Sequence, residues 1–377
     1  MNAASRSTSR RENGGAPAED ATPRCRAAGT ARRHPCTRIG AIAAAALLPA
    51  AGVVAQGLLP ATFLAVSDSV VRVEASREQG GLFVGSGITV APSIVATNCH
   101  VTRDAHAINI SGGGRLWTVT GQFANEAHDL CFLRVPTWNG RPAVLGRPES
   151  LRLGQPVAAI GFSGGTGRTL RFGQVRALHA LDGARIIESD TAFTSGASGG
   201  GLFDATGALV GLLTFRLRAA GGNYYSLPVR WISEGLPVDA QWTDIHAVPD
   251  AVAFWQRDAA TLPYFMRAAP LYVEGRWTEL VALTEQWSAA DPRDPEPLRV
   301  RGEAMQRLDR PAAAVSAFSE AVALGPDVPS AWYGLALAYA AVGDAAAAQR
   351  AGSRLAALDR DLALQLHDEV LRLHDSK

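Results

Sequence analysis

The middle of the chain contains many short apolar segments separated by polar breaks. Between residues 62 and 236, runs rich in Val, Ile, Leu and Phe are separated by Gly, Asn and Asp. Such runs predict β-strands. The first set is Ser69–Ala75, Leu82–Val90, Ile94–Ala96, Ala107–Ile110, Leu116–Gly121 and Leu130–Val135. After a joint rich in Pro and Gly at residues 136–148, the second set is Pro156–Phe162, Gly173–Leu178, Ala184–Ser189, Gly201–Asp204, Ala208–Thr214 and Asn223–Leu227. Two sets of six strands with a joint between them predict two β-barrels.

The pattern changes to amphipathic helix from about residue 261. Residues 295–328 and 329–362 align with each other at an offset of 34 residues, and a weaker copy covers residues 261–294. The matching positions are Gly302, Ala314, Phe318, Ala321 and Pro326 in one copy and Trp332, Leu335, Tyr339 and Ala348 in the next. This period predicts paired helices of the tetratricopeptide (TPR) type, with a last helix at about 362–373 as a cap. A general Ala-rich bundle is the alternative.

These patterns divide the chain into a leader (residues 1–55), an all-β domain (62–236), a linker (237–260) and a helical repeat domain (261–377). Residues 1–38 hold eight Arg against three acidic residues, and an apolar run follows over residues 39–55. A basic front followed by an apolar run predicts a secretory signal peptide. The alternative is an uncleaved membrane anchor that continues through residues 56–66. In either case we expect export, to the periplasm or the medium, with membrane attachment only if the segment is uncleaved.

Charge and composition exclude several classes of function. The net charge is +1, and beyond residue 55 there are 28 basic against 32 acidic residues. A mildly acidic folded part does not predict nucleic-acid binding. Cys25 and Cys36 lie in the leader, and the two remaining Cys with one local His are too few for a structural zinc site, so we expect no metal and no cofactor.

Three short motifs supply a histidine, an aspartate and a serine, in that order. They are Thr97-Asn98-Cys99-His100-Val101, His128-Asp129-Leu130-Cys131 and Gly196-Ala197-Ser198-Gly199-Gly200. His100 follows a predicted strand, and Asp129 leads into a buried one, where a carboxylate needs a partner. The order is that of the chymotrypsin arrangement, in which Ser198 is the nucleophile, His100 the general base and Asp129 the residue that orients it.

The glycines around Ser198 let the backbone bend so that its hydroxyl projects and neighbouring N–H groups converge. The N–H groups of Gly196 and Ser198 are the expected oxyanion donors. A flexible loop without chemistry is the alternative for this stretch in isolation.

Cys99 and Cys131 lie beside the predicted base and the predicted orienting residue. An exported compartment permits a disulfide. If His100 and Asp129 are hydrogen-bonded, their neighbours come close enough to pair. Two buried thiols that pack as small apolar groups are the alternative.

Residues 69–232 resemble the trypsin-like serine proteases, specifically the HtrA/Deg type. The resemblance lies in Gly85-Ser86-Gly87, the three motifs above, Gly161-Phe162, the spacing from Asp190 to Ser198, and Tyr225-Ser226-Leu227-Pro228. It implies a double β-barrel and the roles already given to His100, Asp129 and Ser198. The chain departs from the family at Ala197, where Asn or Asp is usual, and in having helical repeats where a PDZ domain is expected.

Counting back from Ser198 places the specificity pocket between Ala192, Phe193 and Thr194 on one wall and Thr214–Arg216 and Tyr224–Ser226 on the other. This set contains no carboxylate, so we expect cleavage after a small or medium apolar residue. The chain is thus predicted to be an exported serine endopeptidase acting on proteins or peptides, with TPR repeats that bind a partner or substrate. The alternative is a catalytically inactive protease fold that serves as a binding scaffold.

Overall fold

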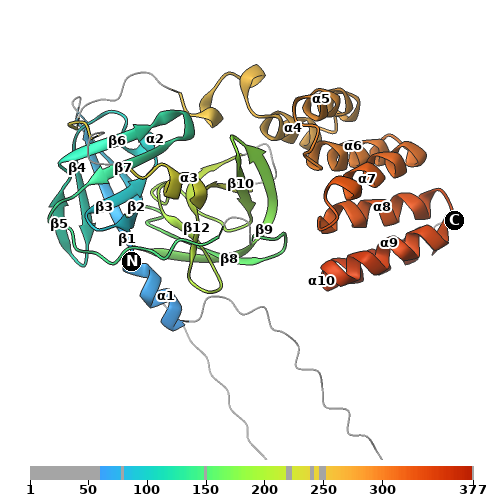
Figure 1. The fold of residues 1–377 in the computed structure, drawn as a ribbon, viewed down its shortest axis with the longest axis horizontal. Coiled ribbons are helices and arrows are strands. Elements are labelled where there is room, and N and C mark those ends of the chain that lie inside the picture. The colour runs from blue at the N-terminus through green and yellow to red at the C-terminus, as the bar shows by residue number, and fades with distance from the viewer. Residues whose placement is uncertain are drawn as a thin grey trace, which may run out of the picture. The chain divides into compact units, whose positions relative to one another are not determined.

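The computed structural model describes residues 60–77, 80–147, 151–217, 223–237, 242–245 and 252–375 (Figure 1). The leader expected over residues 1–55 lies outside them. Helix α1 (Pro60–Ser67) precedes the first strand. Among the described residues, no helix has the length and apolar character needed to cross a bilayer.

The first set of strands forms one seven-stranded antiparallel sheet in the order β5-β4-β1-β2-β3-β7-β6. Its strands are β1 (Val70–Arg77), β2 (Leu82–Ala91), β3 (Ile94–Thr97), β4 (Ala105–Gly112), β5 (Arg115–Thr118), β6 (Gly121–Asn125) and β7 (Leu130–Arg134). The strand predicted over Leu116–Gly121 is divided between β5 and β6. The division arises because Val119 N bonds to Ile108 O in β4, whereas Thr120 N bonds to Arg134 O in β7. The pairing does not close this sheet into the first of the two expected barrels.

The second set of strands forms a closed barrel in the order β10-β13-β12-β11-β8-β9. Its strands are β8 (Pro156–Gly161), β9 (Thr169–Leu181), β10 (Ala184–Ser189), β11 (Gly201–Asp204), β12 (Leu209–Arg216) and β13 (Tyr224–Pro228). Each contains one strand predicted from the sequence or overlaps it closely. Helix α3 (Val229–Glu234) follows the barrel.

Seven helices make up the C-terminal part, drawn in orange to red in Figure 1. They are α4 (Tyr264–Val273), α5 (Trp277–Ala290), α6 (Glu296–Arg307), α7 (Pro311–Leu324), α8 (Pro329–Ala341), α9 (Ala345–Leu358) and α10 (Arg360–Asp375). Each of the three aligned sequence stretches contains one pair of helices, and α10 contains the whole of the predicted last helix. A buried apolar cluster extends from the closed barrel, through Tyr225 and Leu227, to Phe265 of α4 and Leu280 of α5.

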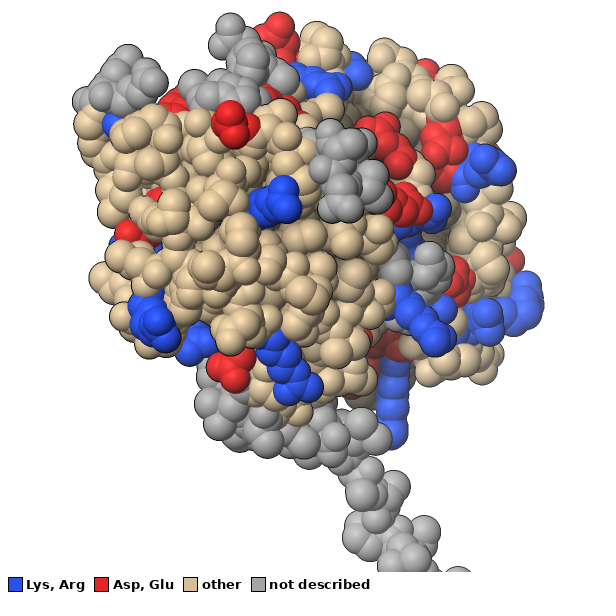
Figure 2. All heavy atoms as spheres, turned by 60° about the vertical axis from the view of Figure 1, so that its left-hand side comes forward, with Lys and Arg blue, Asp and Glu red and all other residues tan. Residues whose placement is uncertain are grey.

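The surface seen in Figure 2 carries basic and acidic side chains interspersed with wide uncharged areas. On this face neither sign of charge gathers into one extended patch. The interspersed charges agree with the near-neutral balance of the sequence.

Helices α6 and α8 approach each other closely around one aromatic ring. Phe318 of α7 is fully buried. An added Cβ at Gly302 would lie 2.8 Å from this ring, and one at Gly334 would overlap it. Because Gly302 and Gly334 have no side chain, the Phe318 ring fits between α6 and α8.

We therefore expect Gly334→Ala to destabilise the helical part by about 1–3 kcal/mol, because an overpacked core must shift. Gly352→Ala is the matched control. Its Cβ would lie 3.4 Å from Leu366, an ordinary contact, and alanine favours a helix over glycine. Chemical unfolding followed by circular dichroism measures both. Equal stability of the two variants would contradict this packing.

Candidate active site

The carboxylate of Asp129 is fully buried and accepts three hydrogen bonds. The backbone N–H of His100 donates to Oδ1 at 2.8 Å. The His100 ring nitrogen Nδ1 lies 2.7 Å from Oδ2, and the indole Nε1 of Trp255 donates to the same oxygen at 3.0 Å. A buried charge is tolerated only where hydrogen bonds replace the lost water. These three donors therefore hold the carboxylate in one orientation toward the imidazole.

Local backbone structure brings His100 and Asp129 together. Asp129 follows the short 3-10 helix η1 (Glu126–His128) in the left-handed conformation, with φ of 56°. Its carbonyl accepts from Cys99 N at 3.2 Å and from Asn98 Nδ2 at 3.0 Å. His100 lies in the single-turn helix α2 (Cys99–Thr102), immediately after β3. The predicted base and orienting residue are thus neighbours across β3 and β7.

Cys99 and Cys131 form a disulfide beside this pair. Their Cα atoms lie 4.9 Å apart, because β3 and β7 are paired with Thr97 opposite Cys131. Both residues are buried. The bridge ties the turn that carries His100 to the strand that follows Asp129.

Ser198 lies in the loop before β11, at the junction of the sheet and the barrel. Its carbonyl accepts from Ser86 N of β2 at 2.8 Å, and the next residue, Gly199, bonds through N–H to Leu213 O of β12 at 2.8 Å. Its hydroxyl donates to Thr214 O at 3.2 Å. Among the described residues, no hydrogen bond joins Ser198 to His100. The Ser198 hydroxyl, the third of the three predicted catalytic groups, is thus bonded to the Thr214 carbonyl and not to the His100 ring.

The backbone N–H groups of Gly196 and Ser198 donate no hydrogen bond within the described residues. The carbonyl groups of the same two peptide units are bonded on the opposite side: Ser195 O accepts from Gly164 N, and Ala197 O from Gly200 N, both at 2.8 Å. These bonds fix both N–H directions. Gly196 has φ of 95°, and a Cβ there would overlap Phe162 O, so only glycine fits. The loop thus presents two oriented donors without a protein partner.

Sequence reasoning missed Trp255, which lies in the segment expected to be a linker. The hydroxyl of Thr214 donates to Leu212 O at 2.8 Å and accepts from Asn98 Nδ2 at 3.1 Å. Thr214 therefore reaches Asp129 only through Asn98. No motif marks Trp255, because its contact is made across 126 positions of the chain.

Of the predicted pocket residues, Phe193 and Tyr224 contact each other across the two walls, whereas Tyr225 lies on the other face of β13. The rings of Phe193 and Tyr224 are 4.9 Å apart. Adjacent residues of a strand point to opposite faces, so Tyr225 points away from Phe193. It stacks on Phe215 at 4.9 Å and lines a different cavity. Ser226 is buried on the same side of β13 as Tyr224, whereas Ala192 and Thr194 are exposed on the loop.

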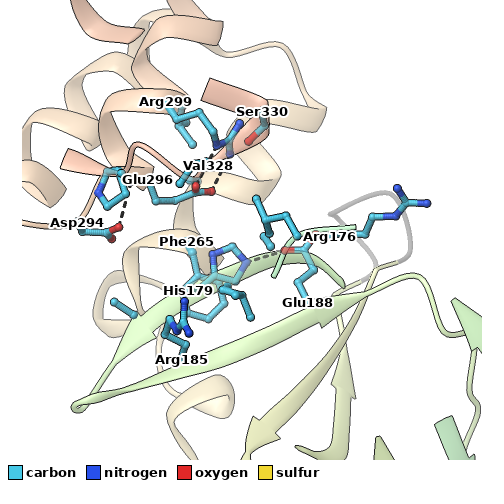
Figure 3. Close-up of a pocket in the computed structure, with 18 of the residues that line it drawn as sticks. Arg176, His179, Arg185, Glu188, Phe265, Asp294, Glu296, Arg299, Val328 and Ser330 are labelled. Carbon is cyan, nitrogen blue, oxygen red and sulfur yellow. Dashed lines mark hydrogen bonds and ion pairs between the residues drawn. The ribbon is translucent and has the colours of Figure 1, made fainter. Parts of the chain in front are cut away.

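That second cavity, of about 840 Å³, lies between strands β9 and β10 and helices α4 and α6 (Figure 3). The ring of Phe265 stacks on His179 at 4.2 Å. His179 Nε2 lies 2.7 Å from Glu188 Oε2, and Asn223 donates to the other oxygen of Glu188. On the helical side, Arg299 pairs with Glu296 at 2.7 Å. The cavity therefore has apolar walls with paired charges on both sides.

Burial and hydrogen bonding act against each other on the acids of this cavity. Burial raises the pKa of Glu188, but the hydrogen bond and charge of His179 and the hydrogen bond from Tyr225 outweigh it, so the pKa is lowered. Burial likewise raises the pKa of the Tyr225 hydroxyl, and the charge of Glu188 adds to that effect. Asp294 differs, because burial and the charges of Glu296 and Asp291 raise its pKa to about 6, against the backbone hydrogen bond from Glu296 N and the charge of His179.

Comparison with known proteins agrees with this arrangement. Residues 85–212, which include His100, Asp129 and Ser198, match the family described as the trypsin-like peptidase domain. These residues lie in the antiparallel sheet and the closed barrel, and the helical region follows them.

Relatives of the peptidase domain include anti-sigma-I factor RsgI9 of Acetivibrio thermocellus, 30% identical over 42% of this chain and 23% of that protein. The periplasmic serine endoprotease DegP of Salmonella typhimurium is 30% identical over 39% of this chain and 33% of that protein. The chain thus spans a third or less of the length of these two relatives. The solved structure of the HtrA-type protease AlgW with tripeptide is 26% identical, covers 46% of this chain and 60% of that chain, and has a TM-score of 0.43.

The raised pKa of Asp294 makes stability depend on pH. The folded state holds the proton up to a pH of about 6, whereas the unfolded chain releases it near 4, so stability falls as pH rises through this window. Asp294→Asn keeps the acceptor for Glu296 N and removes the charge. We expect it to raise stability at pH 7 by about 1–2 kcal/mol and to leave it nearly unchanged at pH 4. Thermal unfolding at both pH values measures this. An equal effect at the two pH values would contradict it.

Proposed function

We propose that the chain is an exported serine endopeptidase that cleaves proteins or peptides through His100, Asp129 and Ser198. The observation that carries the proposal is the buried Asp129 carboxylate, 2.7 Å from His100 Nδ1. A carboxylate bonded to Nδ1 orients the imidazole so that Nε2 is the nitrogen that can accept the proton of the serine hydroxyl. Two oriented amide donors next to Ser198 support the same function.

The proposed reaction begins when the Ser198 hydroxyl rotates from the Thr214 carbonyl toward His100. His100 Nε2 takes the hydroxyl proton as Oγ forms a bond to the peptide carbonyl carbon. The N–H groups of Gly196 and Ser198 stabilise the negative oxygen of the tetrahedral intermediate. His100 then gives the proton to the leaving amine, and an acyl-enzyme remains. Water, deprotonated by His100, releases the acid and restores Ser198.

The proposed substrate preference is a small or medium apolar residue before the cleaved bond. The described wall residues Phe193, Tyr224 and Ser226 carry no charge. Asp190, the acidic residue nearest in sequence to Phe193, accepts hydrogen bonds from the Arg176 side chain and from Gln174 N, the latter at 2.7 Å. It is therefore already paired and does not supply an anchor for a basic side chain.

The proposed site of action is outside the cytoplasm. The disulfide between Cys99 and Cys131 suits an oxidising compartment, and the DegP relatives are named as periplasmic. A secretory signal in the leader would deliver the chain there.

The proposed role of the helical region is to hold a protein partner or substrate, as TPR-like repeats. Paired helices in the aligned stretches and glycines opposite Phe318 support the repeat assignment. The cavity beside α4 and α6 offers apolar side chains such as Tyr272 and Val273 next to the peptidase barrel. A protein substrate bound there would extend along the barrel surface.

Hydrolysis of casein and of a short apolar chromogenic peptide tests the peptidase proposal. We expect the full chain to cleave both and Ser198→Ala to lose at least about 10³-fold of the rate, because it lacks the nucleophile. A fluorophosphonate should label the wild type at Ser198 and leave Ser198→Ala unlabelled. Absence of both cleavage and labelling in the folded wild type would favour the inactive scaffold.

The role of the helical region is tested with two exposed valines. Val273 is 57% exposed and lines the cavity, whereas Val342, at the end of α8, is 44% exposed and does not line it. We expect Val273→Glu to raise KM for casein several-fold and to leave KM for the short peptide unchanged. Val342→Glu should change neither. An unchanged KM for casein in Val273→Glu would remove the cavity from substrate binding.

A further inference from the structure

Trp255 contacts two members of the proposed triad, although it lies 126 positions beyond Asp129 in the chain. Its indole Nε1 donates to Asp129 Oδ2 at 3.0 Å, the same oxygen that faces His100 Nδ1. Its ring also meets the His100 imidazole edge to face, with centroids 5.4 Å apart and planes at 87°. One side chain thus contacts both the carboxylate and the ring that the carboxylate orients.

The segment around Trp255 is fixed by packing rather than by secondary structure. It forms only the 3-10 turn η5 (Phe254–Gln256). Trp255 stacks on Phe215 of β12 with centroids 5.2 Å apart, and the buried Phe254 packs against Phe215 and Trp231. Gln256 accepts a hydrogen bond from Arg103, just after α2, at 3.1 Å. The indole is therefore held from both the barrel and the turn that carries His100.

Within the described residues, the Asp129 carboxylate has no side-chain donor other than the His100 ring and the Trp255 indole. The hydroxyl of Thr214 is bonded to Leu212 O and Asn98. Without the indole N–H, Oδ2 would keep only the His100 contact and could rotate in its buried site. A carboxylate that rotates no longer holds the imidazole in one plane, and small misplacements of a catalytic group cost rate.

We propose that Trp255 is a positioning residue of this active site, which acts on His100 by fixing the Asp129 carboxylate. This inference rests on the proposed peptidase function. It makes the segment between the peptidase domain and the helical region a functional part of the site. The segment that leads to α4 then affects kcat and also joins the barrel to the helical region.

The test compares Trp255→Phe with Trp231→Phe in the full chain. Phenylalanine at 255 keeps an aromatic ring against Phe215 and removes only the donor. Trp231 is the matched control, because it is a buried tryptophan that packs on the same segment and its Nε1 has no partner among the described residues. We expect Trp255→Phe to lower kcat for the short peptide about tenfold, which corresponds to about 1.4 kcal/mol, with KM unchanged. Trp231→Phe should keep wild-type kcat.

A double-mutant cycle separates positioning from general structural damage. If Trp255 acts through Asp129, Trp255→Phe should have no further effect on the fluorophosphonate labelling rate in an Asp129→Ala background. A wild-type kcat in Trp255→Phe, or an equal loss in both backgrounds, would overturn the proposal.

Hydrogen exchange of the indole N–H groups gives a readout that does not depend on activity or on Trp255 variants. We expect the Trp255 N–H to exchange slowly in the wild type and faster in Asp129→Ala, with Trp231 unchanged. Equal exchange of Trp255 in the two proteins would overturn the contact. A wild type that neither cleaves nor labels Ser198 would instead overturn the peptidase function, and the positioning role with it.

Discussion

The burial of the Asp129 carboxylate is the constraint on which the rest of the site depends. A charge removed from water costs several kcal/mol unless polar groups replace the solvent. The chain meets this requirement with the His100 backbone N–H, the His100 ring and the Trp255 indole. Two of these donors belong to His100 in the turn of α2 and the third belongs to Trp255 in η5, so both segments must be in place before the carboxylate is satisfied.

The same requirement explains why the site is held by long-range contacts. Cys99 is bonded to Cys131, Ser86 binds the backbone of Ser198 and the hydroxyl of Ser86 donates to Gly196 O at 2.7 Å. The disulfide ties the turn of α2 to β7, and the Ser86 contacts link β2 of the sheet to the loop before β11 of the barrel. The catalytic loop is therefore oriented by the first set of strands, although it belongs in sequence to the second.

The helical region packs on the barrel through a buried apolar cluster and through the ring of Phe265, which contacts a polar network on the barrel. Phe265 stacks on His179, which contacts Glu188, and Glu188 is also hydrogen-bonded to Tyr225. Tyr225 is adjacent to Tyr224, whose ring meets Phe193 near the proposed specificity pocket. Strand alternation places the two tyrosines on opposite faces of β13, so Tyr224 faces the proposed specificity pocket and Tyr225 faces the cavity beside the helices.

Local sequence patterns were enough to predict much of the secondary structure and the candidate catalytic residues. The strand positions, the helix pairs and the identities of His100, Asp129 and Ser198 as candidates follow from period, turn residues and motif order, which are properties of neighbouring residues. Tertiary structure decided what depends on contacts between distant residues. It left the first sheet unclosed, divided the strand predicted at Leu116–Gly121, and turned Tyr225 toward the helical cavity. It also brought Trp255 to Asp129, because packing on Phe215, and no local signal, determines where that indole lies.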